Sequence, residues 1–143
     1  MGRQLNQSGP DLLLLYDGWC GLCNGSVRFI LRHDRRRTMR FAPLQGSTAG
    51  ALLQRYPQLR SADSLIVIET SEGTETLRLR SDGLLRIAEY LGGGFSLFLL
   101  FRFIPRSLRD SVYDLVARLR YRIAPRYSSC PVPSPEHRSR FLE

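Results

Sequence analysis

The chain contains no lysine, few cysteines and no long apolar segment. All 21 of its basic residues are arginine. Three cysteines in 143 residues are too few for a fold held together by disulfides. The longest apolar stretch, residues 95–101, is far shorter than the roughly 20 residues that cross a bilayer. A hydrophobic content of 43% and a charged content of 24% are instead typical of a globular domain with one core.

The sequence contains no recognisable targeting segment. Residues 1–10 are polar and predict a flexible N-terminus, and the four leucines at 12–15 are too few for the apolar core of a signal peptide. We therefore expect a cytoplasmic protein without stable membrane insertion. Its folded domain is predicted at residues 11–133, followed by a polar tail at 134–143.

The arginines give a formal net charge of +8 and gather in two segments, residues 28–40 and 102–126, each with a net charge of +5. Such segments attract anionic partners, including nucleic acid and anionic lipid. They lack interleaved aromatic residues and match no nucleic-acid-binding module. Solvated helix faces are therefore the favoured interpretation, and we expect no nucleic-acid partner.

Two cysteines separated by two residues, Cys20 and Cys23, are the most informative motif. Such a pair closes a small disulfide ring or supplies half of a metal site. The apolar run 12–16 before the pair is bounded by Pro10 and by Asp17-Gly18, which predicts a buried strand. After the pair, residues at helical spacing separate into an apolar face (Cys23, Val27, Ile30, Leu31) and an opposite, polar face (Asn24, Arg28, Arg32, Arg35).

The predicted position of the pair at a helix N-terminus gives its two sulfurs different chemistry. The unpaired N–H groups of the first turn and the helix dipole stabilise an anion, so we expect Cys20 to have a lowered pKa and to be the exposed nucleophile. Cys23, one turn deeper, is expected to stay protonated until it resolves a mixed disulfide. The alternative is a pair of buried, inert cysteines packed as small apolar residues. The strand–turn–helix context favours the redox pair.

The rest of the chain alternates between strand and helix signals. Strands are predicted at 12–16, 38–44, 64–68 and 75–80, the last two joined by a turn at Gly73, and helices at 21–34, at 47–56 and from Ser81 or Asp82 to the glycines at 92–94. This α/β order, β-α-β-α-β-β-α, is that of a thioredoxin-like core. An additional C-terminal helix is predicted after Pro105.

The stretch Asp17-Gly18-Trp19-Cys20-Gly21-Leu22-Cys23 after an apolar strand resembles the motif of the DCC family of thiol-disulfide oxidoreductases, named for an Asp followed by two Cys. The resemblance covers about residues 11–133. It includes residues 40–45, 63–67, 81–85 and 113–122, which resemble the family's second strand, third strand, third helix and closing segment, and also Cys130-Pro131. It implies a thioredoxin-like fold and thiol-disulfide exchange.

Three further residues are candidates for the site. Asp17 can act as the general base for the resolving thiol or serve only as a turn residue, and the sequence leaves both roles open. Trp19 is expected to contribute apolar area to substrate docking. Thioredoxins carry a cis-proline before the third strand, where this chain has Asp63-Ser64. Ser64 either faces the substrate disulfide or forms a structural turn.

The segment after Gly94 extends the minimal core. Residues 94–104 are rich in aromatic and aliphatic side chains, and we expect them in the core, with a membrane-surface or partner-binding element as the alternative. The helix after Pro105 is expected to pack on the domain through Leu108, Val112, Leu115, Val116 and Leu119. Cys130 is either a third redox thiol or, as we favour slightly, a cysteine without a catalytic role.

The hypothesis for function is thiol-disulfide exchange, with Cys20 as nucleophile, Cys23 as resolving thiol and Asp17 assisting proton transfer. The substrate is expected to be a disulfide-containing protein or small thiol compound, and the electron donor a dithiol or glutathione. No prosthetic cofactor and no metal are implied. The alternatives are a zinc-binding module, for which only Cys130, His33 and His137 remain as further ligands, and a protein-interaction module with non-catalytic cysteines.

Overall fold

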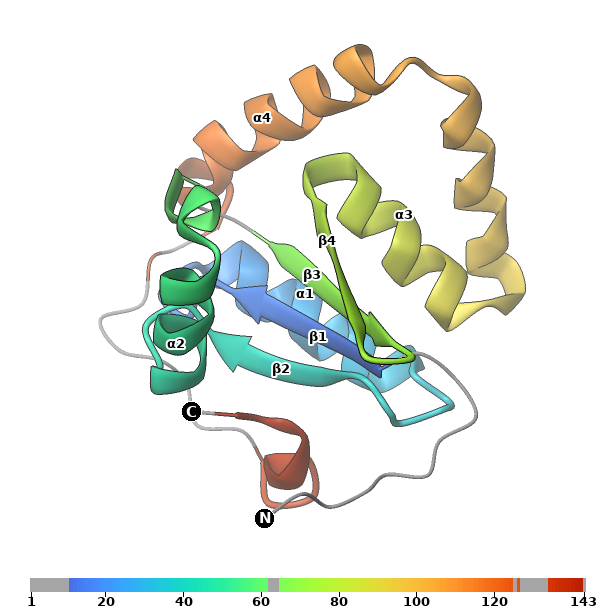
Figure 1. Ribbon diagram of the computed structural model, residues 1–143. Coiled ribbons are helices and arrows are strands. Elements are labelled where there is room, and N and C mark those ends of the chain that lie inside the picture. The colour runs from blue at the N-terminus through green and yellow to red at the C-terminus, as the bar shows by residue number, and fades with distance from the viewer. Residues whose placement is uncertain (1–10, 62–64, 125, 127–133, 143) are drawn as a thin grey trace.

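The computed structural model describes residues 11–61, 65–124, 126 and 134–142 (Figure 1). Its strands are β1 (Asp11–Tyr16), β2 (Arg40–Pro43), β3 (Ile66–Ser71) and β4 (Thr74–Leu79). Its helices are α1 (Gly21–His33), α2 (Ser47–Arg55), α3 (Arg80–Leu91), α4 (Arg106–Ile123) and three 3-10 helices, η1 (Pro57–Ser61), η2 (Gly93–Phe103) and η3 (Arg138–Arg140). These strands form one mixed sheet in the order β2-β1-β3-β4. This α/β architecture is consistent with a thioredoxin-like fold and confirms the predicted fold class.

The central strand β1 is buried on both faces of the sheet, which explains its uninterrupted apolar sequence. It pairs in parallel with β2 and antiparallel with β3. Because side chains alternate along a strand, Leu14 and Tyr16 join the core that contains residues of α1 and α3. Leu15 points to the other face and packs with residues of α2 and η1.

The β3–β4 hairpin turns at Gly73, as the sequence predicted. Glu72 and Gly73 have φ angles of 50° and 78°, and two positive φ angles in a two-residue loop match the right-handed twist of the flanking strands. The start of α3 differs from the prediction. The helix begins at Arg80 after an N-cap at Leu79, and neither Ser81 nor Asp82 caps it. Both side chains are instead engaged with α4, Ser81 donating to Asp110 and Asp82 pairing with arginines.

The expectation that residues 94–104 lie in the core is wrong. This segment forms η2, in which no residue is buried. It continues into α4, and Figure 1 shows the two helices as an arc around the outer side of α3. The apolar face predicted to hold α4 on the domain is also largely open, since Leu108, Val112 and Leu115 are all more than half exposed. None of the described helices is long and apolar enough to cross a membrane.

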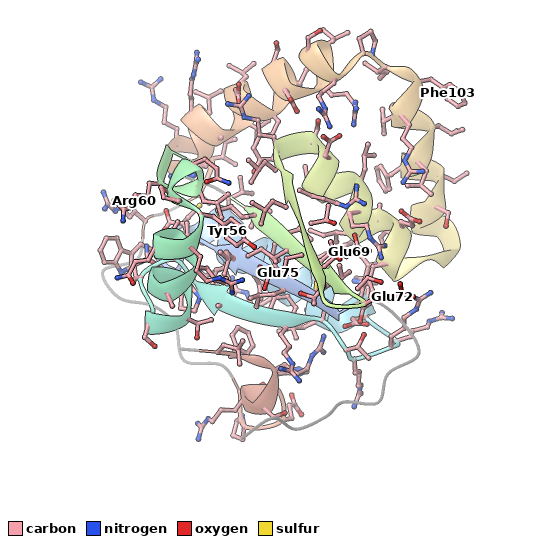
Figure 2. All side chains as sticks on the ribbon, in the orientation of Figure 1. Tyr56, Arg60, Glu69, Glu72, Glu75 and Phe103 are labelled. Carbon is pink, nitrogen blue, oxygen red and sulfur yellow. The ribbon has the colours of Figure 1, made fainter. Side chains whose placement is uncertain are left out.

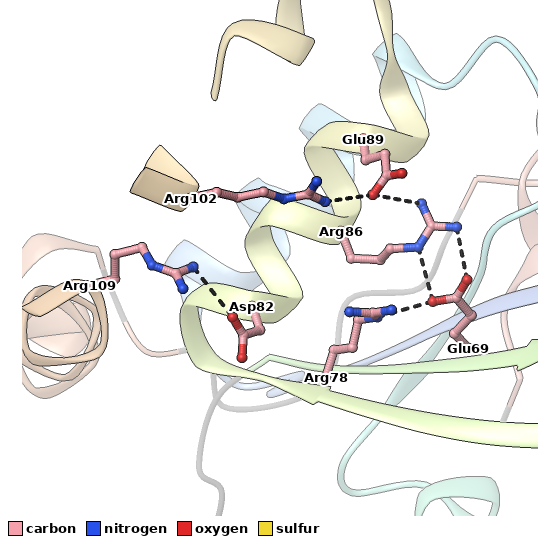
Figure 3. A network of polar contacts seen from close by, with 7 residues as sticks. All are labelled: Glu69, Arg78, Asp82, Arg86, Glu89, Arg102 and Arg109. Carbon is pink, nitrogen blue, oxygen red and sulfur yellow. Dashed lines mark hydrogen bonds and ion pairs between the residues drawn. The ribbon is translucent and has the colours of Figure 1, made fainter. Parts of the chain in front are cut away.

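A network of arginines and carboxylates joins the sheet to α3 and to the C-terminal helices (Figure 3). The Arg86 guanidinium donates to both oxygens of Glu69 at 3.0 Å, and Arg78 Nε donates to the same carboxylate at 3.1 Å. These hydrogen bonds, chiefly that from Arg86, hold the pKa of Glu69 below its usual value. Farther along α3, Glu89 accepts from Arg102 of η2 at 2.9 Å.

Residues 134–142, which the sequence analysis sets apart as a polar tail, lie against β2. Phe141 forms a parallel bridge to Phe41, and the two rings stack with centroids 5.3 Å apart. Arg140 donates to the Met39 carbonyl at 3.0 Å and pairs with the buried carboxylate of Asp34. The described C-terminal residues therefore add an aromatic ring and a buried ion pair to this edge of the sheet.

Candidate dithiol site

Cys20 is the N-cap residue of α1, as its position in the sequence predicted. Its extended backbone (φ −88°, ψ 120°) follows the β1–α1 turn, and the Cys20 N–H donates to the Asp17 carbonyl at 3.1 Å. The Cys20 sulfur accepts the backbone N–H of Cys23 at 3.3 Å. An acceptor at the N-cap position contacts an N–H group that has no partner within the helix, and it lies at the positive end of the helix dipole. Both features favour a negatively charged group at this position.

Cys23 lies on the buried face of α1, in contact with the first thiol. The pKa of Cys23 is raised to about 12, chiefly by burial and also by the hydrogen bond and charge interaction with Cys20. The backbone of Asp17 and the positive charge of Arg120 act in the opposite direction. Cys20 and Cys23 are both free thiols in the structure. The two thiols are therefore close together and differ in environment.

Asp17 is buried and multiply bonded at the end of β1. Its Oδ1 accepts the Trp19 N–H at 3.0 Å, which is the turn role, and the Gln45 side-chain amide at 2.9 Å. Its Oδ2 lies 3.6 Å from Arg120 Nη2 of α4, and both side chains are only 8% exposed. The Asp17 carboxylate therefore contacts three parts of the chain: the β1–α1 turn, the loop after β2 and the C-terminal part of α4.

Three residues of this site were missed by the sequence analysis. Asn24 was placed on the solvent face of α1, but it is buried, and its amide donates to the carbonyls of Gly18 and Cys20 at 2.9 Å. Gln45 and Arg120 were quoted only within segments that resemble the family. The only indication of these two residues is that a buried Asp beside a dithiol needs polar partners. Nothing in the local sequence identifies which of the 21 arginines is such a partner.

The expectation that Cys20 is exposed is wrong. Its exposed fraction is 0%, and Cys20 forms an antiparallel bridge with Arg126. The Arg126 guanidinium lies 5.6 Å from the centroid of the Trp19 ring, which is itself 38% exposed. Trp19 is thus partly exposed beside the pair, whereas Cys20 is buried.

A large apolar groove begins at the dithiol. It has a volume of about 1080 Å³ and lies between α1 and α3 on one side and η2 and α4 on the other. Cys23 and Leu22 line one end, and Arg120 lines it at the same end. Side chains along the rest of the groove are almost all aliphatic or aromatic, including Phe98 and Val112. The site therefore adjoins a surface suited to apolar groups.

Among the other candidate ligands, His33 lies away from the pair. Within the described part of the chain, no three metal-binding side chains come together. His33 lies ten residues beyond Cys23 on α1, about 15 Å along the helix axis, and its ring packs on Phe29. Ser64 and Cys130 lie outside the described residues.

A dithiol at the N-terminus of the helix that follows the central strand of such a sheet is the arrangement of thioredoxin-like redox proteins. The comparisons identify the particular family. The family model described as DCC1-like thiol-disulfide oxidoreductase matches residues 14–126, and the chain belongs to this family.

Two relatives span most of the chain. It is 36% identical to the uncharacterized protein YuxK of Bacillus subtilis (strain 168), over 93% of this chain and 95% of that protein. It is 34% identical to a chloroplastic DCC family protein of Arabidopsis thaliana, over 82% of this chain and 67% of that protein. No solved structure matches the chain.

Proposed function

We propose that the protein catalyses thiol-disulfide exchange, with Cys20 as the attacking thiol and Cys23 as the resolving thiol. One observation carries the assignment. The Cys20 sulfur is the N-cap group that accepts the Cys23 N–H at 3.3 Å, whereas burial raises the pKa of Cys23 to about 12. The N-terminus of α1 stabilises negative charge on the first sulfur, and the second sulfur keeps its proton until it is needed.

The reaction has two steps. The Cys20 thiolate attacks one sulfur of a substrate disulfide, a mixed disulfide forms, and the other substrate sulfur leaves as a thiolate. Cys23 then gives up its proton, attacks the Cys20 sulfur and releases the second substrate thiol. The substrate gains two electrons and the pair becomes a disulfide, which a partner dithiol or two glutathione molecules reduce again.

Asp17 and Arg120 assist the second step. The Arg120 charge and the backbone of Asp17 both lower the pKa of Cys23, opposing the effect of burial. We assign the Asp17 carboxylate as the acceptor of the Cys23 proton, in addition to its bonds to the turn. Asp17 is paired with Arg120 across 3.6 Å, so α4 contributes to holding this carboxylate in position.

Attack by Cys20 requires a movement that exposes its sulfur, and opening of the bridge between Cys20 and Arg126 would contribute to it. Cys20 has no exposed surface, and a disulfide must approach the sulfur directly to form the mixed disulfide. Trp19 and the apolar groove then offer contact area to a substrate protein or a small disulfide. The bridge between Cys20 and Arg126 is a single pair of residues, so its opening disturbs little of the fold.

Trapping of the mixed disulfide tests this proposal. Reduced protein is mixed with oxidised glutathione and with a disulfide-containing peptide, and the products are identified by mass spectrometry. Cys23→Ser should accumulate a mixed disulfide at Cys20, Cys20→Ser should accumulate far less, and the unmodified protein should end as the internal disulfide with two substrate thiols released. Cys130→Ser is the matched control and should behave as the unmodified protein. Faster adduct formation in Cys20→Ser would reverse the two roles, and absence of an internal disulfide would exclude the activity.

A further inference from the structure

The 3-10 helix η2 has two apolar stripes. A 3-10 helix has three residues per turn, so residues three apart lie above one another. Phe95, Phe98 and Phe101 form one stripe and line the groove, where the Phe95 ring meets Phe29 of α1 at 5.6 Å. Residues 97, 100 and 103 form the other stripe, and none of them lines the groove. The second stripe therefore faces away from the domain.

This outer stripe is more exposed than apolar side chains of a folded domain usually are. Leu97, Leu100 and Phe103 are 71%, 63% and 87% exposed. Figure 2 shows the Phe103 side chain extending outward from the rim of the molecule. At about 2 Å per residue the stripe is roughly 12 Å long. A contiguous exposed apolar patch of this kind marks an interaction surface.

The surroundings of the stripe are positively charged. Arg102 pairs with Glu89, and Arg106 and Arg109 at the start of α4 both pair with Asp82, so three arginines meet two carboxylates here. Arg102 lies within η2 beside Phe103, and Arg106 follows at the start of α4, with side chains 54% and 70% exposed. Farther along α4, Arg118 and Arg122 are also exposed.

We propose that the outer stripe of η2 docks the protein peripherally on an anionic membrane surface. Leu97, Leu100 and Phe103 would enter the interface between headgroups and acyl chains, while the arginines contact anionic headgroups. Charge selects this occupant. The chain carries a formal net charge of +8, so a second copy docked through the same face would bring two positive surfaces together. The dithiol site lies at the opposite end of α4 and stays open to substrates in this arrangement.

Flotation of the full-length reduced protein with lipid vesicles tests the proposal. Vesicles of phosphatidylcholine alone are compared with vesicles containing roughly 30% phosphatidylglycerol. We expect partitioning into the anionic vesicles to exceed that into neutral ones at least tenfold, and to fall as salt is raised to 0.5 M, because each arginine near the surface contributes roughly fivefold. Leu97→Ser/Leu100→Ser/Phe103→Ser should lower binding to anionic vesicles more than tenfold.

Two variants keep this test specific. Phe103→Ser alone changes a side chain that is 87% exposed, so it should reduce binding severalfold without affecting the fold. Val112→Ser/Val116→Ser removes apolar groups that line the groove and should leave binding unchanged.

Three outcomes would overturn the proposal. They are equal binding to neutral and anionic vesicles, loss of binding only in the groove variant, and a dimer in light scattering that the triple variant abolishes. Thiol exchange in solution is measured on the same proteins. The stripe variants should retain it, so failure of membrane docking and failure of the proposed activity are distinguishable.

Discussion

The Asp17–Arg120 ion pair offers the sharpest test of how the dithiol site is built. Its atoms lie 3.6 Å apart, and both side chains are 8% exposed. At an effective dielectric constant of about 20, two unit charges at this distance attract by about 4–5 kcal/mol before desolvation is counted. Removing one partner leaves the other charge buried and uncompensated, so removing the second partner as well should cost little more.

We therefore expect non-additive losses of stability. Asp17→Asn keeps the size and part of the turn hydrogen bonding, and Arg120→Met keeps the apolar stem. Each single variant should lower the free energy of unfolding by about 2–3 kcal/mol. The double variant should lose about the same amount rather than the sum, which gives a coupling energy of about 2–3 kcal/mol. Single domains are stable by about 5–15 kcal/mol, so all three variants should still fold.

Urea unfolding of the reduced proteins at pH 7 measures these values. Arg118→Met is the matched control, because Arg118 is exposed on the same helix and its loss should change stability by less than about 0.5 kcal/mol. The reasoning is refuted if the two single effects add within about 0.5 kcal/mol, since the buried charges would then be independent. Kinetics on the same set separate the proposed proton-transfer role. Asp17→Asn should slow release of a Cys20 mixed disulfide by about 10²-fold or more while barely changing its formation.

Three other predictions follow from burial and charge. In Cys20→Ser, burial should still raise the pKa of Cys23, so alkylation of Cys23 should be slow at pH 7 and should accelerate about tenfold per pH unit as pH rises, as followed by mass spectrometry. The pKa of Glu69 in the folded protein is lowered from 4.5. The ionised carboxylate therefore stabilises the fold fully above pH 4.5, and this stabilisation is lost as the pH falls through the folded-state pKa. Glu69→Gln should therefore be less stable at pH 7 by about 1–2 kcal/mol and show a shallower loss between pH 5 and pH 3 in thermal unfolding. Leu14→Ala removes a side chain with no exposed surface and should cost about 2–5 kcal/mol in urea unfolding, with a smaller loss contradicting the assigned core.

Patterns of short range were sufficient to predict the strand–turn–helix unit around the pair. The run of leucines before Asp17 required a strand covered on both faces, and the helical spacing from Cys23 to Ile30 required a helix that begins at the cysteines. Both properties depend on the periodicity of one element. The same holds for the turn at Gly73, where positive φ angles suit a short hairpin.

The partners of the site depend instead on contacts between distant segments. Arg120 is about 100 residues from Asp17 along the chain, and the residues around Arg120 do not distinguish it from the other arginines among the 21. The bridge between Cys20 and Arg126, beyond the end of α4, likewise joins segments that are distant in the sequence. Sequence periodicity cannot report which surfaces meet after folding.

By itself, the sequence determined the class of fold, the motif and the order of the elements up to α3, because each follows from local spacing of apolar residues and turn formers. The tertiary structure alone decided that η2 and α4 leave an open groove and an outward apolar stripe. An apolar run at helical spacing is equally compatible with a buried and an exposed helix. The choice depends on whether another surface of the chain is available to cover it, and around η2 only one of the two stripes meets such a surface.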